Sequence, residues 1–228
     1  MAKGGEKVLI SSDCPKGGGS PVTREVFCHY CRLLYDRHLV TGVGGNLSVR
    51  VGNKFFITPS GLSLRDITPD AVVVINEAGK VLDGGIPTKD MEVHLGLLHR
   101  WPDINVVCHL HGDFIIAASS LMKPGPHSLP PVTPGFVYFA HPLPMIGFQV
   151  PGSKALAKAV AKHFSRKGCR ALLLQNHGLI TVGKSFLEAI NIAEEIDEAA
   201  RIFVLTNGRA RVISEDGIKG IKSLPDSK

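Results

Sequence analysis

Three histidines stand at positions from which their imidazole rings could converge on one metal ion. His109 and His111 are separated by one residue in the apolar segment INVVCHLH (104–111), which predicts a strand. Because side chains alternate between the two faces of a strand, both rings should point to the same side, about 7 Å apart. His177 lies in Gln-Asn-His-Gly between two apolar runs, where a turn could aim its ring into a cleft. Three histidine ligands would leave an open coordination position, which is typical of a catalytic metal site.

The ligand type also limits the choice of metal. Imidazole nitrogens suit zinc first, although manganese, cobalt or iron would also fit. A lone buried histidine is more often a hydrogen-bonded core residue, so the metal hypothesis depends on the three histidines together. Cys28 and Cys31 have the C-x-x-C spacing, but they lack a second pair and fall on an amphipathic helix pattern, which favours core packing.

An acidic side chain before the histidine segment could move a proton beside such a metal. Asp90 begins a predicted helix over 90–100 and precedes His94 by four residues, so the two share one face. A carboxylate next to a cation could be a proton shuttle or a fourth ligand. Glu92 points about 200° away around the helix, so only one of the two carboxylates can face the same pocket. We expect Asp90 to be that carboxylate, with Glu92 as the competitor.

Three polar segments, two of which contain glycine, could bind an anion. They are Gly44-Gly45-Asn46-Leu47-Ser48, Thr58-Pro59-Ser60-Gly61 and Pro87-Thr88-Lys89-Asp90. Small residues, hydroxyl groups and free backbone N–H groups can form a concave nest for phosphate or carboxylate oxygens. At the start of the predicted helix, the helix dipole and the charge of Lys89 would both favour an anion, although Thr88 could equally be a simple N-cap.

The elements that carry these residues alternate without the regular order of a doubly wound fold. Helical periodicity covers 21–39, 90–100, 114–121, 153–164 and 185–205, and strand-like segments fall within 41–61 and at 71–76, 104–111, 171–175 and 179–182. The segment 123–152 is rich in proline and is predicted to form turns and short strands. The order predicts one α/β domain over residues 21–228 around a mostly antiparallel sheet, after a tail over residues 1–20.

Composition narrows the class of function. A chain of 228 residues with 44% hydrophobic residues can bury one sizeable core. The net charge of +6 suits an anionic ligand, but the basic residues are dispersed and carry no nucleic-acid-binding motif. No apolar run is long enough to span a bilayer or to form a signal peptide, and the five cysteines are scattered. We therefore expect a cytoplasmic protein with a small-molecule partner and neither a nucleic-acid nor a membrane partner.

Taken together, the motifs resemble the class II aldolase family, which includes L-fuculose-phosphate aldolase and ribulose-phosphate 4-epimerase. The motifs are G-G-N-L-S, I-T-P-S-G, P-T-K-D-x-x-x-H, V-V-C-H-L-H and Q-N-H-G-L, in this order over about residues 22–207. The resemblance implies a three-layer α/β/α fold, a homotetramer with active sites at subunit interfaces, and a zinc ion held by His109, His111 and His177.

The resemblance also implies a reaction and roles for the polar residues. The reaction is the zinc-dependent cleavage of a phosphorylated ketose to dihydroxyacetone phosphate and an aldehyde, through a metal-stabilised enediolate. Asp90 would move the proton. The residues expected to bind the substrate and its phosphate are Gly45, Asn46, Thr58, Ser60, Gly61, Thr88 and Lys89.

Two departures from the family pattern keep other reactions open. The family's aldolases typically read Ser-Ser-Glu where this chain reads Thr88-Lys89-Asp90; the lysine resembles a branch that decarboxylates 3-oxo-tetronate phosphates, and the aspartate resembles the epimerases. The aldolases also carry a tyrosine acid that 132–136 lacks, and Tyr138 could replace it only if the loop were shifted. The alternatives are a metal-dependent decarboxylase of a 3-oxo sugar acid phosphate, a sugar-phosphate epimerase and a non-catalytic binding protein, the last disfavoured because all three histidines are present.

Overall fold

The computed structural model describes residues 22–164 and 168–225, so the tail predicted over residues 1–20 lies outside the described residues. An eight-stranded sheet runs through the centre in the order β4-β3-β2-β1-β5-β8-β7-β6. The strands are β1 (Asn46–Val51), β2 (Lys54–Ile57), β3 (Val73–Asn76), β4 (Val81–Asp83), β5 (Val106–Leu110), β6 (Met145–Ile146), β7 (Ala171–Leu174) and β8 (Gly178–Gly183). Every neighbouring pair is antiparallel except β6 with β7, which confirms the mostly antiparallel sheet.

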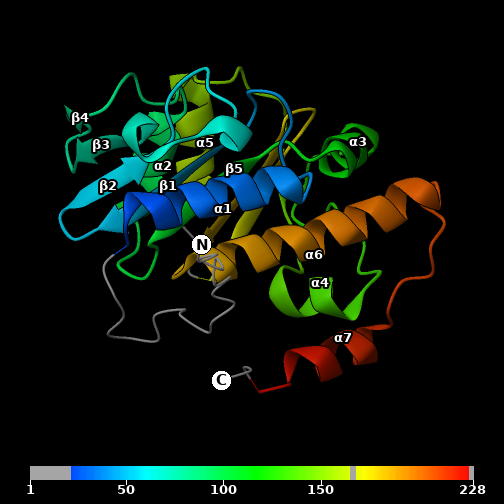
Figure 1. Ribbon diagram of the computed structural model, residues 1–228. Helices are drawn as coiled ribbons and strands as arrows, with labels where there is room; N and C mark the ends of the chain where they lie inside the picture. The colour runs from blue at the N-terminus through cyan, green and yellow to red at the C-terminus, as the bar shows by residue number, and fades with distance from the viewer. Residues whose placement is uncertain (1–21, 165–167, 226–228) are drawn as a thin grey trace, which may run out of the picture.

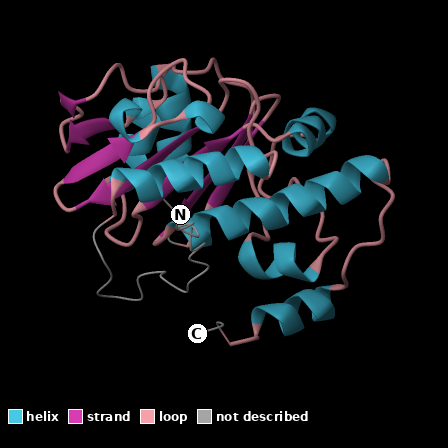
Figure 2. Ribbon diagram, in the orientation of Figure 1, coloured by secondary structure: helices cyan, strands magenta, loops and turns pink. Residues whose placement is uncertain are grey.

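Helices cover both faces of this sheet (Figure 1, Figure 2). One face carries α1 (Arg24–Asp36), α3 (Asp113–Leu121) and α6 (Phe186–Leu205), and the other carries α2 (Met91–Leu98) and α5 (Lys154–His163). Alternate residues of the central strands enter two separate cores: Cys108 packs with α1 and α6, while its neighbour Val107 packs with α2 and α5. The alternation of side chains in β5 therefore builds the α/β/α layers that the family resemblance implied.

Two α-helices and one strand were not predicted. The helix α4 (Pro134–Phe139) lies inside the proline-rich segment 123–152, where only turns and short strands were expected. It forms because Thr133 caps it through the Phe136 N–H and Pro134 occupies the first turn, where no N–H is needed. The edge strand β4 and the helix α7 (Glu215–Lys222) bury none of their residues, so they leave little apolar pattern in the sequence. No helix among the described residues is long and apolar enough to cross a membrane.

Candidate metal centre

The rings of the three predicted histidines converge at one end of the paired strands β5 and β8. The Nε2 atom of His109 lies 3.2 Å from Nε2 of His177 and 3.0 Å from Nε2 of His111. Ligand atoms about 2.0–2.1 Å from a tetrahedral zinc would lie roughly 3.3 Å apart, close to these distances. Since a neutral imidazole carries a single N–H, three Nε2 atoms at this spacing are satisfied better by one cation than by one another. The residues present therefore fit a divalent metal ion.

The surrounding backbone sets the tautomer of one of these rings. Nδ1 of His109 lies 3.2 Å from the carbonyl oxygen of Leu179 in β8, so Nδ1 carries the proton and donates it. The lone pair of Nε2 is then directed to the other two rings, which is the usual arrangement of a metal-binding histidine. The predicted strand ends one residue early, at Leu110, so His111 follows β5, yet its ring centroid lies 4.6 Å from that of His109.

Glycines in two of the motifs allow the backbone to approach His111 closely. A Cβ atom on Gly44 would lie 2.7 Å from Nδ1 of His111. A Cβ atom on Gly178 would lie 2.1 Å from the carbonyl oxygen of Leu110 and 3.0 Å from Cδ2 of His111, at a backbone φ of +156°. These positions exclude larger residues for reasons of packing around the histidines, apart from any contact with a ligand.

Asp90 is the carboxylate that faces the histidine cluster. Its Oδ2 atom lies 3.8 Å from Nε2 of His109, whereas Glu92 is exposed on α2. Oδ2 accepts a hydrogen bond from Asn46 Nδ2 at 3.0 Å, and Oδ1 accepts one from the backbone N–H of Gly152 at 3.1 Å. Asp90 is the N-cap residue of α2, one position before the helix, so the prediction that Thr88 could cap this helix was wrong.

Burial controls the protonation of the cluster. Removal from water lowers the pKa of His109 from 6.5 to about 4 and that of His111 to about 3, and it also lowers the pKa of His177. Burial alone would raise the pKa of Asp90, but the neighbouring His109 and the Asn46 amide outweigh it and hold the pKa below its ordinary value of 3.8. At neutral pH the site therefore presents three neutral imidazoles and one carboxylate, the forms that bind a divalent cation.

The three predicted anion-binding segments meet beside Asp90. The backbone N–H of Thr88 donates to the carbonyl oxygen of Thr58 at 3.0 Å, and the Thr58 hydroxyl accepts from the backbone N–H of Leu47 at 3.2 Å. Thr58 and Thr88 are buried, whereas Ser60 is half-buried. Gly61 and Lys89 are exposed, and Gly45 and Asn46 lie next to the histidine strand. The fold thus brings the three predicted segments together, and the assignment of their residues to a substrate stays a prediction.

Sequence reasoning missed two groups that surround Asp90. The N–H of Gly152 comes from the loop after β6, sixty-two positions along the chain, and no local pattern signals it. Ser48 and His94 form a buried hydrogen bond behind Asn46, at 2.6 Å between Ser48 Oγ and His94 Nδ1. The four-residue spacing of Asp90 and His94 did predict that these two share a face, but it assigned His94 no contact.

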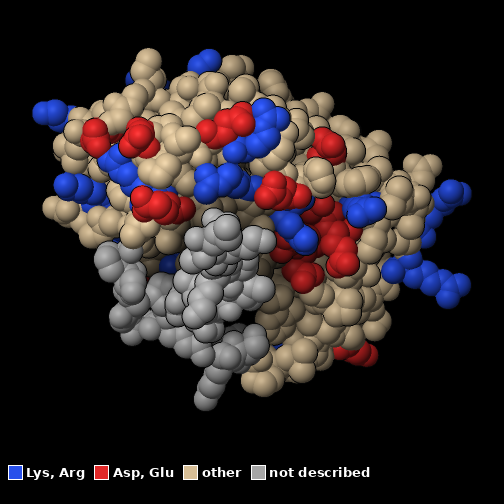
Figure 3. All heavy atoms as spheres, in the orientation of Figure 1, with Lys and Arg blue, Asp and Glu red and all other residues tan. Residues whose placement is uncertain are grey.

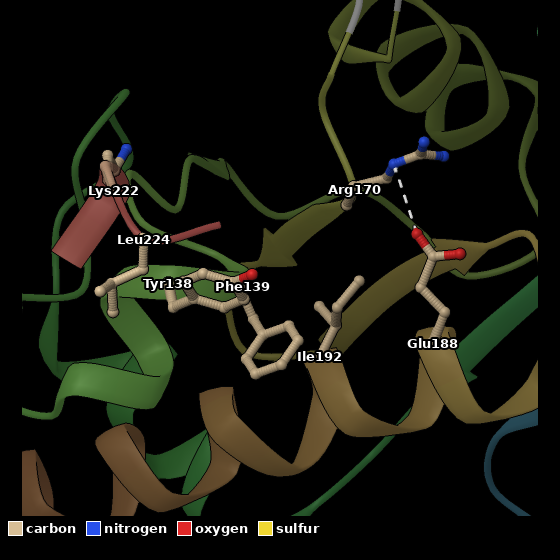
Figure 4. Close-up of a pocket in the computed structure, with 7 residues that line it drawn as sticks. All are labelled: Tyr138, Phe139, Arg170, Glu188, Ile192, Lys222 and Leu224. Carbon is tan, nitrogen blue, oxygen red and sulfur yellow. Dashed lines mark ion pairs between the residues drawn. The ribbon is translucent and has the colours of Figure 1, made fainter. Parts of the chain in front are cut away.

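Tyr138 lies away from the histidine cluster in this chain. Its hydroxyl is 3.4 Å from the carbonyl oxygen of Pro225, and its ring lines a separate cavity of about 480 Å³. The other lining residues are Phe139, Arg170, Glu188, Ile192, Lys222 and Leu224 (Figure 4). None of them belongs to the histidine cluster or its loops. On the face drawn in Figure 3, basic side chains are interspersed with acidic ones instead of forming one basic patch.

Known proteins share this fold and about a third of the aligned sequence. The family profile of the class II aldolase and adducin N-terminal domain matches residues 25–204. L-fuculose phosphate aldolase of Methanococcus maripaludis is 34% identical over 181 residues, which are 79% of this chain and 96% of that protein. The 3-oxo-tetronate 4-phosphate decarboxylase of Haemophilus influenzae is 30% identical over 203 residues, 88% of this chain and 96% of that protein. The solved structure of YgbL from Klebsiella pneumoniae, described as a candidate aldolase/epimerase/decarboxylase, has a TM-score of 0.80 at 31% identity and covers 87% of this chain and 96% of its own.

Proposed function

This chain belongs to the class II aldolase and adducin N-terminal domain family, and we propose that it cleaves a carbon–carbon bond of a phosphorylated ketose, releasing dihydroxyacetone phosphate and an aldehyde. It is an enzyme of the metal-dependent lyase class. One observation carries the proposal: three histidine Nε2 atoms converge within hydrogen-bond distance, and the carboxylate of Asp90 lies 3.8 Å from one of them.

The histidines and Asp90 would have separate roles in such a cleavage. A divalent cation held by His109, His111 and His177, with zinc as the first choice, would supply Lewis-acid stabilisation of the negative charge that develops on the substrate oxygens. His109 keeps its Nε2 lone pair free by donating its Nδ1–H to Leu179. Asp90, with each oxygen already accepting one hydrogen bond, would shuttle the proton: it would accept the one released from the substrate hydroxyl as the bond breaks and deliver it to the carbon of the enediolate.

Phosphate binding would fall to the loops beside Asp90. Lys89 is exposed next to the start of α2, where a lysine charge and a helix N-terminus both attract an anion. Ser60 offers a half-buried hydroxyl, and Gly61 follows it with a backbone φ of +76° in an exposed turn. We assign these three residues, together with Gly45, Asn46, Thr58 and Thr88, to the substrate and its phosphate.

Decarboxylation of a 3-oxo sugar acid phosphate is the second candidate reaction. Loss of carbon dioxide takes no proton from the substrate, whereas aldol cleavage must take one from the hydroxyl beside the bond that breaks. The enediolate left by either reaction is then protonated at carbon. Decarboxylation also requires no tyrosine acid, and Tyr138 of this chain lines another cavity. In this reaction Lys89 would instead lie near the substrate carboxylate or phosphate. The similarity to the decarboxylase of Haemophilus influenzae also extends over more of this chain than the similarity to the archaeal aldolase.

The assembly and the compartment are part of the same proposal. We expect a homotetramer in which a neighbouring subunit covers the site. The loops next to Asp90 support this, because they expose Val43, Ile86, Phe148 and Val150, each at least half accessible. We also expect the enzyme in the cytoplasm. The described cysteines are all free, and Cys28, Cys31 and Cys108 are buried, as a reducing compartment allows.

A parallel assay tests the proposal. The purified protein is reconstituted with zinc, manganese, cobalt or iron(II) and offered a ketose 1-phosphate and a 3-oxo-tetronate 4-phosphate, while dihydroxyacetone phosphate and carbon dioxide are followed. Dihydroxyacetone phosphate from the ketose supports the aldolase, and carbon dioxide from the keto acid alone supports the decarboxylase. The variant His177→Ala should lose both metal and turnover, whereas His127→Ala, which removes an exposed histidine outside the cluster, should retain them. A metal-loaded protein that releases neither product would contradict both reactions.

A further inference from the structure

A chain of buried hydrogen bonds lies behind Asp90. Ser48 Oγ is 2.6 Å from Nδ1 of His94, Nε2 of His94 contacts Oδ1 of Asn46, and Nδ2 of Asn46 is 3.0 Å from Oδ2 of Asp90. Ser48 and His94 are completely buried, and Asn46 and Asp90 are 6% and 8% exposed. Water therefore has little access to any of these groups, and each must be satisfied by its protein partner.

Two periodicities bring these side chains together. Asn46 and Ser48 are alternate residues of β1, so both point to the face of the sheet that α2 covers. Asp90 and His94 are four residues apart at the start of α2, and the N–H of His94 donates to the carbonyl oxygen of Asp90. Asn46 is also the register partner of His109 in β5. The chain thus joins the helix that carries the carboxylate to the strand next to the histidines.

The chemistry of the partners fixes the direction of every hydrogen bond. An ionised Asp90 can only accept, so Asn46 must present its NH₂ group to Asp90 and its oxygen to His94. The oxygen of Asn46 can only accept, so His94 carries its proton on Nε2 and donates it. Nδ1 of His94 is then unprotonated and accepts from the hydroxyl of Ser48. Among the neutral forms of the His94 ring, no other assignment satisfies all four groups.

We propose that His94 is a positioning residue: as its Nε2–H tautomer, held by Ser48, it prevents the Asn46 amide from turning over and so keeps the Asp90 carboxylate directed at the histidine cluster. If the amide turned over, its oxygen would face the carboxylate and its NH₂ group would face the His94 N–H, which places like groups together in a buried site. What Asp90 then does rests on the function proposed above, but the tautomer and the amide orientation do not.

Nuclear magnetic resonance of the ¹⁵N-histidine-labelled full-length protein tests the tautomer directly. Long-range proton–nitrogen correlations distinguish a protonated Nε2 from a protonated Nδ1. His94 should show a protonated Nε2 and an unprotonated Nδ1, in a signal that is absent from His94→Gln. A protonated Nδ1, or a ring protonated on both nitrogens, would overturn the proposal whether or not the protein turns over either substrate.

A matched pair of substitutions tests the consequence for turnover. His94→Gln retains an amide N–H near the position of Nε2 and can still donate to Asn46, whereas His94→Asn is too short to reach it. We expect kcat of His94→Asn to fall by about 10–100-fold with KM little changed, the range usual for residues that support a metal site, and that of His94→Gln to fall much less. Equal losses in two variants with unchanged unfolding temperature would show that the ring only fills space.

Ser48→Ala provides a milder test in case the His94 variants do not fold. It removes only the hydroxyl that holds Nδ1 of His94, so kcat should fall in the same direction as in His94→Asn but by less. Thr181→Val is the control, because it removes a fully buried hydroxyl, bonded to the Ala189 carbonyl oxygen on the other side of β5, without touching this chain. A kcat of Ser48→Ala equal to that of Thr181→Val and of the unchanged protein would contradict a positioning role.

Discussion

Replacing Asp90 with asparagine distinguishes a loss of proton transfer from a loss of structural support. The two oxygens of Asp90 accept from two different donors, Asn46 Nδ2 and the backbone N–H of Gly152. An asparagine at this position must turn its own NH₂ group to one of those donors. One buried hydrogen bond is therefore lost whichever way the new amide faces.

The magnitudes of the two effects differ enough to be told apart. Loss of one buried hydrogen bond should lower the free energy of unfolding by about 1–3 kcal/mol, which leaves a protein of ordinary stability folded at 25 °C. Loss of a group that transfers a proton should lower kcat by about 10²–10⁴-fold. That fold-change corresponds to about 3–5 kcal/mol on the activation barrier. The catalytic effect should therefore exceed what destabilisation alone explains.

The assay measures kcat at saturating ketose phosphate, together with the unfolding temperature, for Asp90→Asn and for Glu92→Gln. Glu92 is an exposed carboxylate on the same helix, so its replacement controls for a lost negative charge near the site. We expect Glu92→Gln to retain the unchanged kcat. A kcat of Asp90→Asn within about threefold of the unchanged protein would refute a role for Asp90 in proton transfer.

Three further expectations follow from the same geometry. His109→Ala should abolish both bound metal and turnover, since the Nε2 atom of His109 lies within 3.2 Å of Nε2 of both His111 and His177. Metal analysis after dialysis and the assay described above check this. Full activity without metal would contradict the proposed metal site. The metal-free protein should lose stability as the pH falls from about 6.5 to 4, by roughly 1 kcal/mol for each buried histidine and pH unit. The reason is that burial lowers the pKa of His94 and of His109 to about 4, so only the unfolded chain takes up protons in that range. Denaturant unfolding at pH 7.5, 6 and 5 measures this loss, and a free energy of unfolding that does not change with pH would show that these rings titrate normally. Gly178→Ala should weaken metal binding in a chelator competition and lower the unfolding temperature, because its Cβ would lie 2.1 Å from the Leu110 carbonyl oxygen. The control Gly96→Ala places a Cβ in open space within α2 and should stabilise the protein by about 0.4–1 kcal/mol. Equal metal affinities and unfolding temperatures in the two variants would refute the packing argument.

The fold was predictable where burial leaves a pattern in the sequence. The long helix α6 and the strands β5 and β8 were predicted to within a few residues, because each packs a clear apolar face into a core. The helix α7 has no buried residue and the strand β4 is wholly exposed, so neither carries such a face. Pro134 and Gly135 are unfavourable residues in most helices, so the sequence did not predict α4, which depends on the Thr133 cap and on packing against α6.

The site was predictable as a set of residues but not as a set of contacts. The H-x-H spacing at the end of β5 and the glycine turn at His177 predicted the cluster that the structure contains. Helix geometry predicted that Asp90 and Glu92 diverge, but it could not say which of them faces inward. That choice depends on how α2 packs against β1, where Asn46 receives the carboxylate, and on Gly152 from a loop far along the chain.

The contacts also divide the predicted substrate-binding residues into two groups. The amide of Asn46 and the hydroxyl of Thr58 already have partners, His94 and Asp90 for the first and the Leu47 N–H for the second. Among the described residues, the side chains of Ser60 and Lys89 make no hydrogen bond or ion pair, so their polar atoms remain available to a substrate. A substitution at Asn46 or Thr58 disturbs the buried hydrogen bonds that orient Asp90, whereas a substitution at Lys89 alters only which anionic groups the site attracts. Discrimination between a ketose phosphate and a sugar acid phosphate should therefore depend on Lys89, whose charge can meet a second anionic group without any rearrangement of the buried network.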